Sequence, residues 1–381
     1  MTDTGPATES RTTSPDTATP GTPGTSPVWY ARPAAREWTC SPAPAEVRAF
    51  HATLPAYAPT PLTELPSLAA ELGVGRVFVK DESARLGLPA FKALGASWAV
   101  DRVLAERTSD TPVELVTATD GNHGRAVARI ARQLGQQAHV FVSQAVHPGA
   151  AASIEGEGAW VTRVAGDYDQ AVREAAAAAR AEDSVLVQDT AWEGYEEVPA
   201  RIVEGYSTLF AEVDEQLAAA GVGGPDLVAV PVGVGSLAQA AVTHYRSRGT
   251  RGPALLAVEP TEAAPGLASL VRGESVTVAA GETVMAGLNC GTLSGLAWPV
   301  LRDGLDAAVA VPDAEALAAG RELGALGVSS GPCGAAALAG ARAALTGAGA
   351  RERRAELGLG AGATVVLLST EGTAANPHGS V

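Results

Sequence analysis

The pattern of hydrophobic and polar residues predicts a chain in which short buried strands alternate with helices. The apolar runs that read as strands are short and unbroken, and most are rich in β-branched residues: 76–83, 113–119, 137–143, 160–166, 184–190, 226–232, 254–260, 307–312 and 363–370. Helical patterns follow most of these runs, and one helix is expected to begin at Ser97. This alternation is typical of parallel sheets that are covered by helices on both faces.

The strands fall into two sets, which predicts an α/β protein with two open, twisted, mainly parallel sheets. A chain of 381 residues is longer than one simple core usually holds, so we expect two domains with a ligand cleft between them. We assign residues 28–96 and 210–381 to a large domain and residues 97–209 to a small domain. Residues 1–27 have too few apolar side chains to fold, so we expect a disordered leader there.

Composition and charge limit the classes of molecule that the protein could bind. The net charge of −15 argues against a nucleic acid and against an anionic membrane surface, because both attract basic patches. No apolar run approaches the roughly 20 residues that cross a bilayer. The cysteines, Cys40, Cys290 and Cys333, lie far apart without metal-binding spacing. This indicates unpaired thiols in a reducing cytoplasm and no metal site.

One lysine lies in unusually apolar surroundings. Lys92 follows Phe91 in the segment "LGLPAFKALGAS" and has few polar neighbours. Most lysines beside a helix simply reach solvent, and Lys92 could do the same. Burial, however, lowers the pKa of a lysine and frees its amine as a nucleophile, which Schiff-base chemistry requires. The segment alone leaves both interpretations open.

A glycine-rich loop follows the apolar run at 226–232. In "PVGVGSLAQAA" the loop amides can converge on one point at the start of a helix, where the helix dipole favours an anion. A plain turn is an equally good interpretation of the loop alone. Ala238 stands where a dinucleotide-binding motif has its third glycine, so a single phosphate is favoured over a dinucleotide.

Polar residues gather at the ends of two other predicted strands. Asp120, Asn122 and His123 lie in "TATDGNHGRAVA", between a strand and a helix. A helix cap would explain one of them but not all three, so a ligand site is favoured. Asp189 ends the run at 184–190, where it is either a turn residue or a carboxylate held at the cleft as a base.

These motifs occur together in the order typical of a known enzyme group. With "LLSTEG" near the end of the chain, they resemble the fold type II pyridoxal-phosphate enzymes, which include the tryptophan synthase β-subunit and threonine dehydratase. More narrowly, five segments resemble the diaminopropionate ammonia-lyase family: "KDESARLGLPAFKALGAS", "ATDGNHGRAVA", "QDTAWEGYEEVP", "VMAGLNCG" and "STEG". The resemblance covers residues 50 to about 373. It implies a tryptophan synthase β-like fold with the cofactor in the cleft between the two domains.

The resemblance also implies how pyridoxal 5'-phosphate would be held. Lys92 would bind it covalently, and Asn122 would contact its 3-hydroxyl group. A hydroxyl group from Ser369 or Thr370 would meet the pyridine nitrogen. The phosphate would be bound by the amides of Gly233, Val234, Gly235, Ser236 and Leu237.

Roles toward the substrate follow from the same resemblance. Thr119, Asp120 and His123 would line the region of the substrate's carboxylate and amine. Lys92 would take the α-proton from one face of the substrate and Asp120 from the other, so that both enantiomers could react. Asp189 would recognise the second ammonium group or assist proton transfer.

The activity implied is that of a carbon–nitrogen lyase, an ammonia-lyase. It would eliminate ammonia from D- or L-2,3-diaminopropionate and give pyruvate through an aminoacrylate, and the family pattern implies a homodimer. A serine or threonine dehydratase is the main alternative, but it needs no second carboxylate, so Asp120 and Asp189 speak against it. A specialised lyase for another β-substituted alanine stays open. A catalytically silent α/β ligand-binding protein is disfavoured by Lys92 and both acids together.

Overall fold

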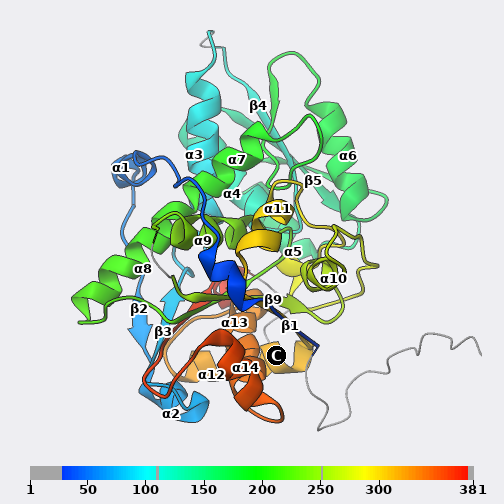
Figure 1. The fold of residues 1–381 in the computed structure, drawn as a ribbon. Coiled ribbons are helices and arrows are strands. Elements are labelled where there is room, and N and C mark those ends of the chain that lie inside the picture. The colour runs from blue at the N-terminus through cyan, green and yellow to red at the C-terminus, as the bar shows by residue number, and fades with distance from the viewer. Residues whose placement is uncertain (1–27, 109–110, 250–251, 376–381) are drawn as a thin grey trace, which may run out of the picture.

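Two β-sheets organise the chain in this computed structural model, which describes residues 28–108, 111–249 and 252–375. One sheet has seven strands in the order β1-β10-β9-β8-β11-β3-β2, and the other has four in the order β6-β5-β4-β7. Figure 1 shows the four-stranded sheet in the upper part of the view, with α3, α4 and α6 around it, and the seven-stranded sheet below. The predicted α/β class with two mainly parallel sheets is confirmed.

All strand pairs are parallel except those of the edge strands β1 and β2. The carboxyl ends of the parallel strands in each sheet therefore lie at one edge. The strands of the large sheet are β1 (Trp29–Ala31), β10 (Ala307–Val311), β9 (Ala254–Pro260), β8 (Leu227–Pro231), β11 (Thr364–Ser369), β3 (Arg76–Asp81) and β2 (Leu62–Glu64). Those of the small sheet are β6 (Trp160–Val164), β5 (Gln137–Ser143), β4 (Glu114–Ala118) and β7 (Ser184–Leu186).

Helices connect the strands and cover both sheets. The α-helices are α1 (Val47–Thr53), α2 (Pro66–Leu72), α3 (Lys92–Ala105), α4 (Asn122–Gln133), α5 (Pro148–Gly156), α6 (Tyr168–Ala178), α7 (Glu197–Gly205), α8 (Ser207–Ala219), α9 (Ser236–Arg246), α10 (Pro265–Arg272), α11 (Ala297–Gly304), α12 (Asp313–Ala325), α13 (Pro332–Leu345) and α14 (Ala350–Leu357). Short 3-10 helices are η1 (Pro33–Glu37), η2 (Ala286–Leu288) and η3 (Thr373–Ala375).

The two faces of the large sheet bury different cores. Because successive strand residues point to opposite faces, Leu227 and Ala229 of β8 join one core, while Val228 and Val230 join the other. The first core lies against α2, α12, α13 and α14. The second continues through α9, α7 and α3 into one face of the small sheet. One apolar core therefore joins both sheets and fixes the space between them.

The structure corrects two element boundaries. Helix α3 begins at Lys92 and not at Ser97. Gly95 disfavours a helix from sequence alone, but the packing of neighbouring residues requires a glycine there. A Cβ atom on Gly95 would lie 2.6 Å from the Tyr206 ring and 2.7 Å from Ile202. The run at 184–190 forms a strand only as far as Leu186.

Two further predictions concern the N-terminal segment and the division into domains. The predicted leader, residues 1–27, lies outside the described residues. The assignment of residues 97–209 to a small domain stays a proposal.

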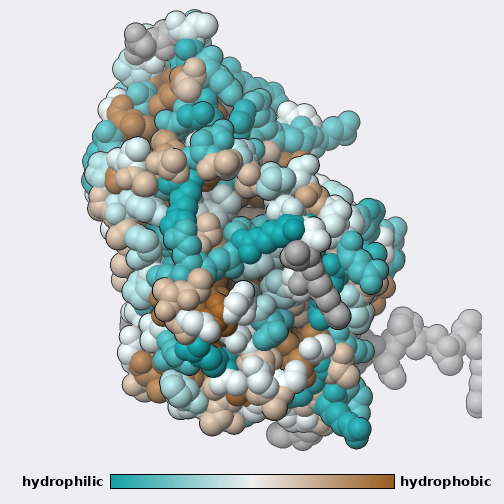
Figure 2. All heavy atoms as spheres, turned by 60° about the vertical axis from the view of Figure 1, so that its left-hand side comes forward, coloured by the Kyte–Doolittle hydropathy of each residue, from teal (hydrophilic) through white to brown (hydrophobic). Residues whose placement is uncertain are grey.

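Helix length and surface hydrophobicity bear on the question of a membrane. Within the described ranges, no helix combines the length and hydrophobicity needed to cross a bilayer. On the face drawn in Figure 2, hydrophobic residues are scattered in small groups among hydrophilic ones. The large hydrophobic side chains that stand out as exposed are Val28, Leu134, Trp160 and Val271.

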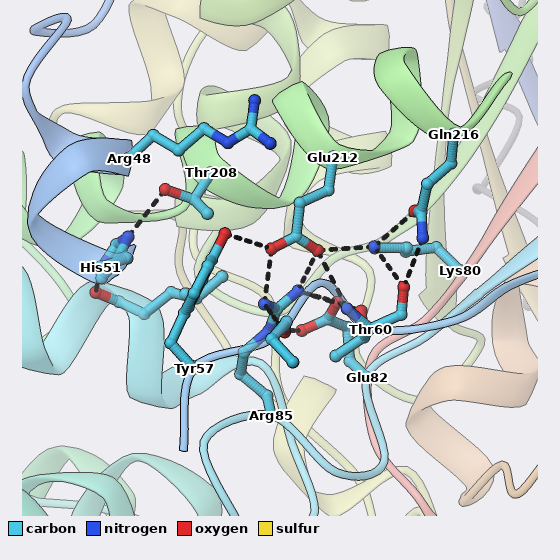
Figure 3. A network of polar contacts seen from close by, with 12 residues as sticks. Arg48, His51, Tyr57, Thr60, Lys80, Glu82, Arg85, Thr208, Glu212 and Gln216 are labelled. Atoms are coloured by element: carbon cyan, nitrogen blue, oxygen red, sulfur yellow. Dashed lines mark hydrogen bonds and ion pairs between the residues drawn. The ribbon is translucent and has the colours of Figure 1, made fainter. Parts of the chain in front are cut away.

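A buried ionic cluster connects α8 with β3 and the segment that follows it (Figure 3). Glu212 of α8 accepts hydrogen bonds from Lys80 Nζ at 2.6 Å and from both terminal nitrogens of Arg85 at 2.7 Å. Arg85 also pairs with Glu82, and all four side chains are fully buried. Although burial opposes ionisation, Arg85 and Lys80 lower the pKa of Glu212. The two acids and two bases therefore compensate one another's charge.

We expect Glu212→Gln to lower the free energy of unfolding by about 3 kcal/mol or more, because it leaves a buried cation uncompensated. Chemical denaturation followed by circular dichroism measures this change. The matched control is Glu64→Gln, which breaks the exposed pair with Arg76 and should cost no more than about 1 kcal/mol. Equal effects of the two substitutions would contradict the structural role of the cluster.

Candidate active site

A cavity lies between the two sheets, where their parallel strands end. Four segments form its walls: the segment after β4, the loop after β8, the residues after β11 and the start of α3. The lining residues are Phe91, Lys92, Thr119, Asp120, Gly121, Asn122, His123, Tyr168, Asp189, Pro231, Gly233, Val234, Gly235, Ser236, Leu237, Ala286, Gly287, Leu288, Cys290, Cys333, Thr370 and Glu371. The structure thus brings together all the predicted site residues except Ser369.

Lys92 is the lysine of this cavity. The sequence holds two lysines, Lys80 and Lys92, and Lys80 is committed to the buried ionic cluster. Lys92 is the first residue of α3, and its side chain is 18% exposed. Its Nζ donates a hydrogen bond to Asp189 Oδ2 at 2.5 Å. The alternative of a surface lysine beside a helix is therefore wrong for Lys92.

Lys92 and Asp189 form a buried ion pair. Burial opposes both charges, but the Asp189 carboxylate raises the pKa of Lys92 above its usual range. In turn Lys92 lowers the pKa of Asp189 to about 2, against the effect of burial. The backbone carbonyl of Asp189 accepts a 2.7 Å hydrogen bond from Ser236 Oγ, which ties it to the start of α9. Without a ligand, the pair is thus held in its charged form.

The glycine loop after β8 presents a row of free amides. Within the described part of the chain, none of the amides of residues 233–237 donates a hydrogen bond. Gly235 has φ +95°, and a Cβ atom there would lie 3.0 Å from Ala297 Cβ. A Cβ atom on Gly233 would lie 2.9 Å from the carbonyl oxygen of Gly287. Convergent amides at a helix N-terminus form a site for a phosphate without any arginine.

A second helix N-terminus faces the cavity from the small sheet. Helix α4 begins at Asn122, and the amide of Gly121 donates to Thr119 Oγ1 at 3.0 Å. Among the described residues, none of the amides of residues 122–124 donates a hydrogen bond, so they are free to bind a carboxylate. Asp120 lies in the same loop, where burial and the nearby Asp189 charge raise its pKa to about 7. Asp120 can therefore gain or lose a proton near neutral pH.

His123 is a neutral, oriented side chain. Its Nε2 lies 2.8 Å from the carbonyl oxygen of Val187, so Nε2 carries the hydrogen and Nδ1 is an acceptor. Nδ1 is buried without a hydrogen-bond partner among the described residues, 3.9 Å from Asp189 Oδ2. Burial lowers the pKa of His123 even though Asp189 opposes this. An unpaired acceptor at this depth is suited to a donor group of a ligand.

Asn122 contacts an acid that was not predicted. Its Nδ2 donates to Glu371 Oε2 at 2.6 Å, and the amide of Cys333 donates to Glu371 Oε1 at 3.3 Å. Glu371 thus bridges α4 and the start of α13, and burial raises its pKa. Glu371 belongs to the "STEG" motif, so the motif was a signal that could have identified it.

The two candidate hydroxyl groups after β11 have different surroundings. Thr370 lines the cavity. The Ser369 hydroxyl group, in contrast, donates to Ser330 Oγ at 2.8 Å and is buried outside the cavity lining. Ser369 is the last residue of β11, and Thr370 is the first residue after the strand.

Tyr168 and Cys290 are further lining residues that sequence reasoning did not assign. Tyr168 begins α6 and accepts a 2.8 Å hydrogen bond from Gln188 Nε2, next to Asp189. Cys290 lies in the "VMAGLNCG" segment, and burial raises the pKa of its thiol. Nothing in the local sequence of Tyr168 distinguishes it from an ordinary helix residue, since only the fold brings it to the cavity.

The cavity opens into a larger outer cavity of about 820 Å³. Its lining is acidic and includes Asp120, Asp167, Asp169, Glu282, Asp313 and Glu371. Among the described residues that line it there is no Lys or Arg. Because walls of one charge raise the local concentration of the opposite charge, this approach favours a cationic ligand.

The residues present fit the cofactor that the sequence predicts. The free amides of the glycine loop match a phosphate, and Lys92 supplies an amine for the aldehyde group. Thr370 offers a hydroxyl group and Asn122 an amide, and both residues line the cavity. These are the donor types that pyridoxal phosphate requires.

Comparison with known proteins agrees with this fit. A profile described as "pyridoxal-phosphate dependent enzyme" matches residues 53–371. A diaminopropionate ammonia-lyase from Salmonella typhimurium is 39% identical over 291 residues, which cover 70% of this chain and 72% of that protein.

Solved structures match the fold as well. Diaminopropionate ammonia-lyase from Escherichia coli, in complex with an aminoacrylate–PLP azomethine reaction intermediate, is 32% identical with a TM-score of 0.82, and the match covers 92% of this chain and 95% of that chain. A threonine deaminase from T.th. is 26% identical with a TM-score of 0.69, and the match covers 87% of this chain and 98% of that chain. The expected fold type II architecture and pyridoxal phosphate as cofactor are thereby confirmed. The chain belongs to the pyridoxal-phosphate dependent enzyme family and, within it, to the diaminopropionate ammonia-lyases.

Proposed function

We propose that the protein eliminates ammonia from 2,3-diaminopropionate and gives pyruvate. The observation that carries this proposal is the pair of carboxylates, Asp120 and Asp189, beside the one lysine of the cavity. A substrate with two ammonium groups needs an additional anionic partner, whereas serine and threonine do not. Two nitrogen atoms leave the substrate in all, since diaminopropionate and one water give pyruvate and two ammonia molecules.

The cavity offers separate positions for the charged groups of this substrate. The free amides at the start of α4 are suited to its carboxylate. Asp189 is suited to its second ammonium group, and the His123 Nδ1 atom beside it can accept a further hydrogen bond. The acidic outer cavity attracts the cationic molecule on its way in. The site would therefore distinguish diaminopropionate from neutral amino acids by its net charge.

The cavity also has positions for the groups of the cofactor. The amides of residues 233–237 would hold its phosphate, Asn122 its 3-hydroxyl group and Lys92 its aldehyde carbon. Of the two hydroxyl groups considered for the pyridine nitrogen, we propose Thr370, because Ser369 donates to Ser330. When bound, pyridoxal phosphate supplies an electron-withdrawing ring that stabilises the charge left by removal of the α-proton.

Two groups of this chain can take that α-proton. Lys92, once its amine is free, can act from the side of α3. Asp120 can act from the loop before α4, where its pKa of about 7 makes it a competent base near neutral pH. We propose that each base serves one enantiomer, so that D- and L-diaminopropionate both react.

We also propose a location in the cell and an oligomeric state. Cys40, Cys290 and Cys333 are free thiols, which supports a reducing cytoplasm. A homodimer is proposed from the family pattern.

We expect Lys92→Ala to remove both the yellow colour of the loaded enzyme and its turnover. Borohydride reduction of the unchanged protein should attach the cofactor to the peptide that contains Lys92, as mass spectrometry would detect. Lys80 serves as the internal control because it is the only other lysine. Cofactor on Lys80, or colour and activity in the variant, would refute the assignment.

Asp120→Asn should lower kcat for one enantiomer at least about 100-fold, because it removes a proton acceptor, and leave the other within about tenfold. In the unchanged enzyme the same enantiomer should lose activity as the pH falls through about 7, since Asp120 is protonated below its raised pKa. Pyruvate release from each pure enantiomer measures both effects. Equal losses on the two enantiomers would rule out the two-base proposal.

Pyruvate release also separates the proposed activity from that of a dehydratase. We expect kcat/KM for diaminopropionate to exceed that for D- or L-serine at least about 100-fold, because serine cannot pair with Asp189. Raising the salt concentration should lower kcat/KM for diaminopropionate more than for serine, since salt screens the acidic outer cavity. A preference for serine would favour the dehydratase alternative.

A further inference from the structure

Glu371 is an acid of the cavity to which the proposed function assigns no task. It follows β11, lines both the inner and the outer cavity, and is only 3% exposed. Taking a carboxylate out of water is costly unless other donors replace its hydrogen bonds to water. Two donors do so here, since Asn122 Nδ2 lies 2.6 Å from Oε2 and the amide of Cys333 lies 3.3 Å from Oε1. The side chain is therefore held at both of its oxygen atoms.

The main chain around Glu371 is fixed as well. Its carbonyl oxygen accepts a 2.9 Å hydrogen bond from the amide of Gly331, and its backbone forms a β-bridge with that of Ala90. A Cβ atom on Gly331 would lie 2.8 Å from Glu371 Oε1, so only a glycine can approach the carboxylate this closely. Because Ala90 lies shortly before Lys92, these contacts also fix Glu371 relative to the start of α3.

The contact between Glu371 and Asn122 joins elements of the two sheets. Asn122 begins α4, which follows a strand of the small sheet, whereas Glu371 follows a strand of the large sheet. Burial raises the pKa of Glu371, but its hydrogen bonds with Cys333 and Asn122 oppose this. Both partners are N–H groups, which can only donate, and this suits the deprotonated form. A carboxylate can only accept, so the Asn122 atom that faces it must be the amide nitrogen.

The orientation of the Asn122 amide decides what it can offer to the cofactor. An amide nitrogen carries two hydrogens, and Glu371 accepts one of them. No other described residue accepts a hydrogen bond from this nitrogen, so its second hydrogen is left for the 3-oxygen of pyridoxal phosphate. That oxygen is ionised in the yellow form of the cofactor, and a donor stabilises the ionised state. A turned amide would present its own oxygen there and would favour the protonated state.

We propose that Glu371 is a positioning residue that fixes the amide of Asn122, so that Asn122 donates to the 3-oxygen of the cofactor and does not accept from it. The inference rests on the proposed contact between Asn122 and that oxygen. One NH₂ group then serves two acceptors, the carboxylate and the cofactor. Glu371→Gln removes this control, because an amide can pair with either end of the Asn122 amide.

Cofactor affinity tests the proposal without any substrate. We expect Glu371→Gln to weaken binding of pyridoxal phosphate about three- to tenfold in equilibrium dialysis, which is the effect of one hydrogen bond. Loss of a negative charge alone would instead strengthen the binding of this anionic cofactor. In Asn122→Ala protein the same substitution should weaken binding less than about twofold, because no amide is left to position. An equal loss in both backgrounds would indicate a merely structural role and overturn the proposal.

The matched control is Glu282→Gln, which removes a carboxylate that lines the outer cavity alone. It should not weaken cofactor binding, because Glu282 is not among the residues of the inner cavity. A loss of affinity equal to that of Glu371→Gln would contradict a specific role of Glu371. Thermal melting of the cofactor-free variants identifies any loss of folding.

The absorbance of the loaded protein gives a second measurement. Glu371→Gln should convert part of the yellow band into near-ultraviolet absorbance, because a turned amide favours the protonated 3-oxygen. Glu371→Gln should cause no such change in Asn122→Ala protein, and Glu282→Gln should leave the bands unchanged. An unchanged yellow band in Glu371→Gln protein would refute the proposal. If the unchanged enzyme does not turn over diaminopropionate, the proposed activity fails, whereas both measurements still decide the role of Glu371.

Discussion

The ion pair between Lys92 and Asp189 is the interaction around which the rest of the site is arranged. It joins the start of α3 to the segment that follows β7, at a depth where neither charge could remain alone. Each partner keeps the other ionised against the effect of burial. The pair therefore keeps the unbound lysine as an ammonium group, which has no lone pair for a reaction.

Anion recognition in this protein relies on backbone amides rather than on basic side chains. The start of α9 and the start of α4 both present free amides to the cavity, one suited to a phosphate and one to a carboxylate. Side chains of the cavity and its approach are therefore free to be acidic, as Asp120 and Glu371 are. A substrate with surplus positive charge fits such a site better than a neutral amino acid. The strongly negative net charge of the chain agrees with this arrangement.

The buried ionic cluster stabilises the scaffold behind the site. Helix α8 starts at Ser207, directly after Tyr206, and carries Glu212 of the buried ionic cluster. That cluster fixes α8 against β3 and the segment after it, through Lys80 and Arg85 (Figure 3). Tyr206 is consequently held from both sides, by the cluster through α8 and by α3 through Phe91.

The sequence by itself determined the alternation of strands and helices, the two sets of strands and the segments that carry the chemistry. These follow from local patterns, since apolar runs, glycine loops and polar residues at strand ends can be recognised without a fold. Tertiary structure alone decided which groups meet. It brought Tyr168, Cys290 and Glu371 to the cavity, placed Thr370 and not Ser369 at its wall, and began α3 at Lys92 because α7 packs on Gly95. Contacts between segments far apart in the chain leave no local signal, so only the packed structure could show that Lys92 pairs with Asp189.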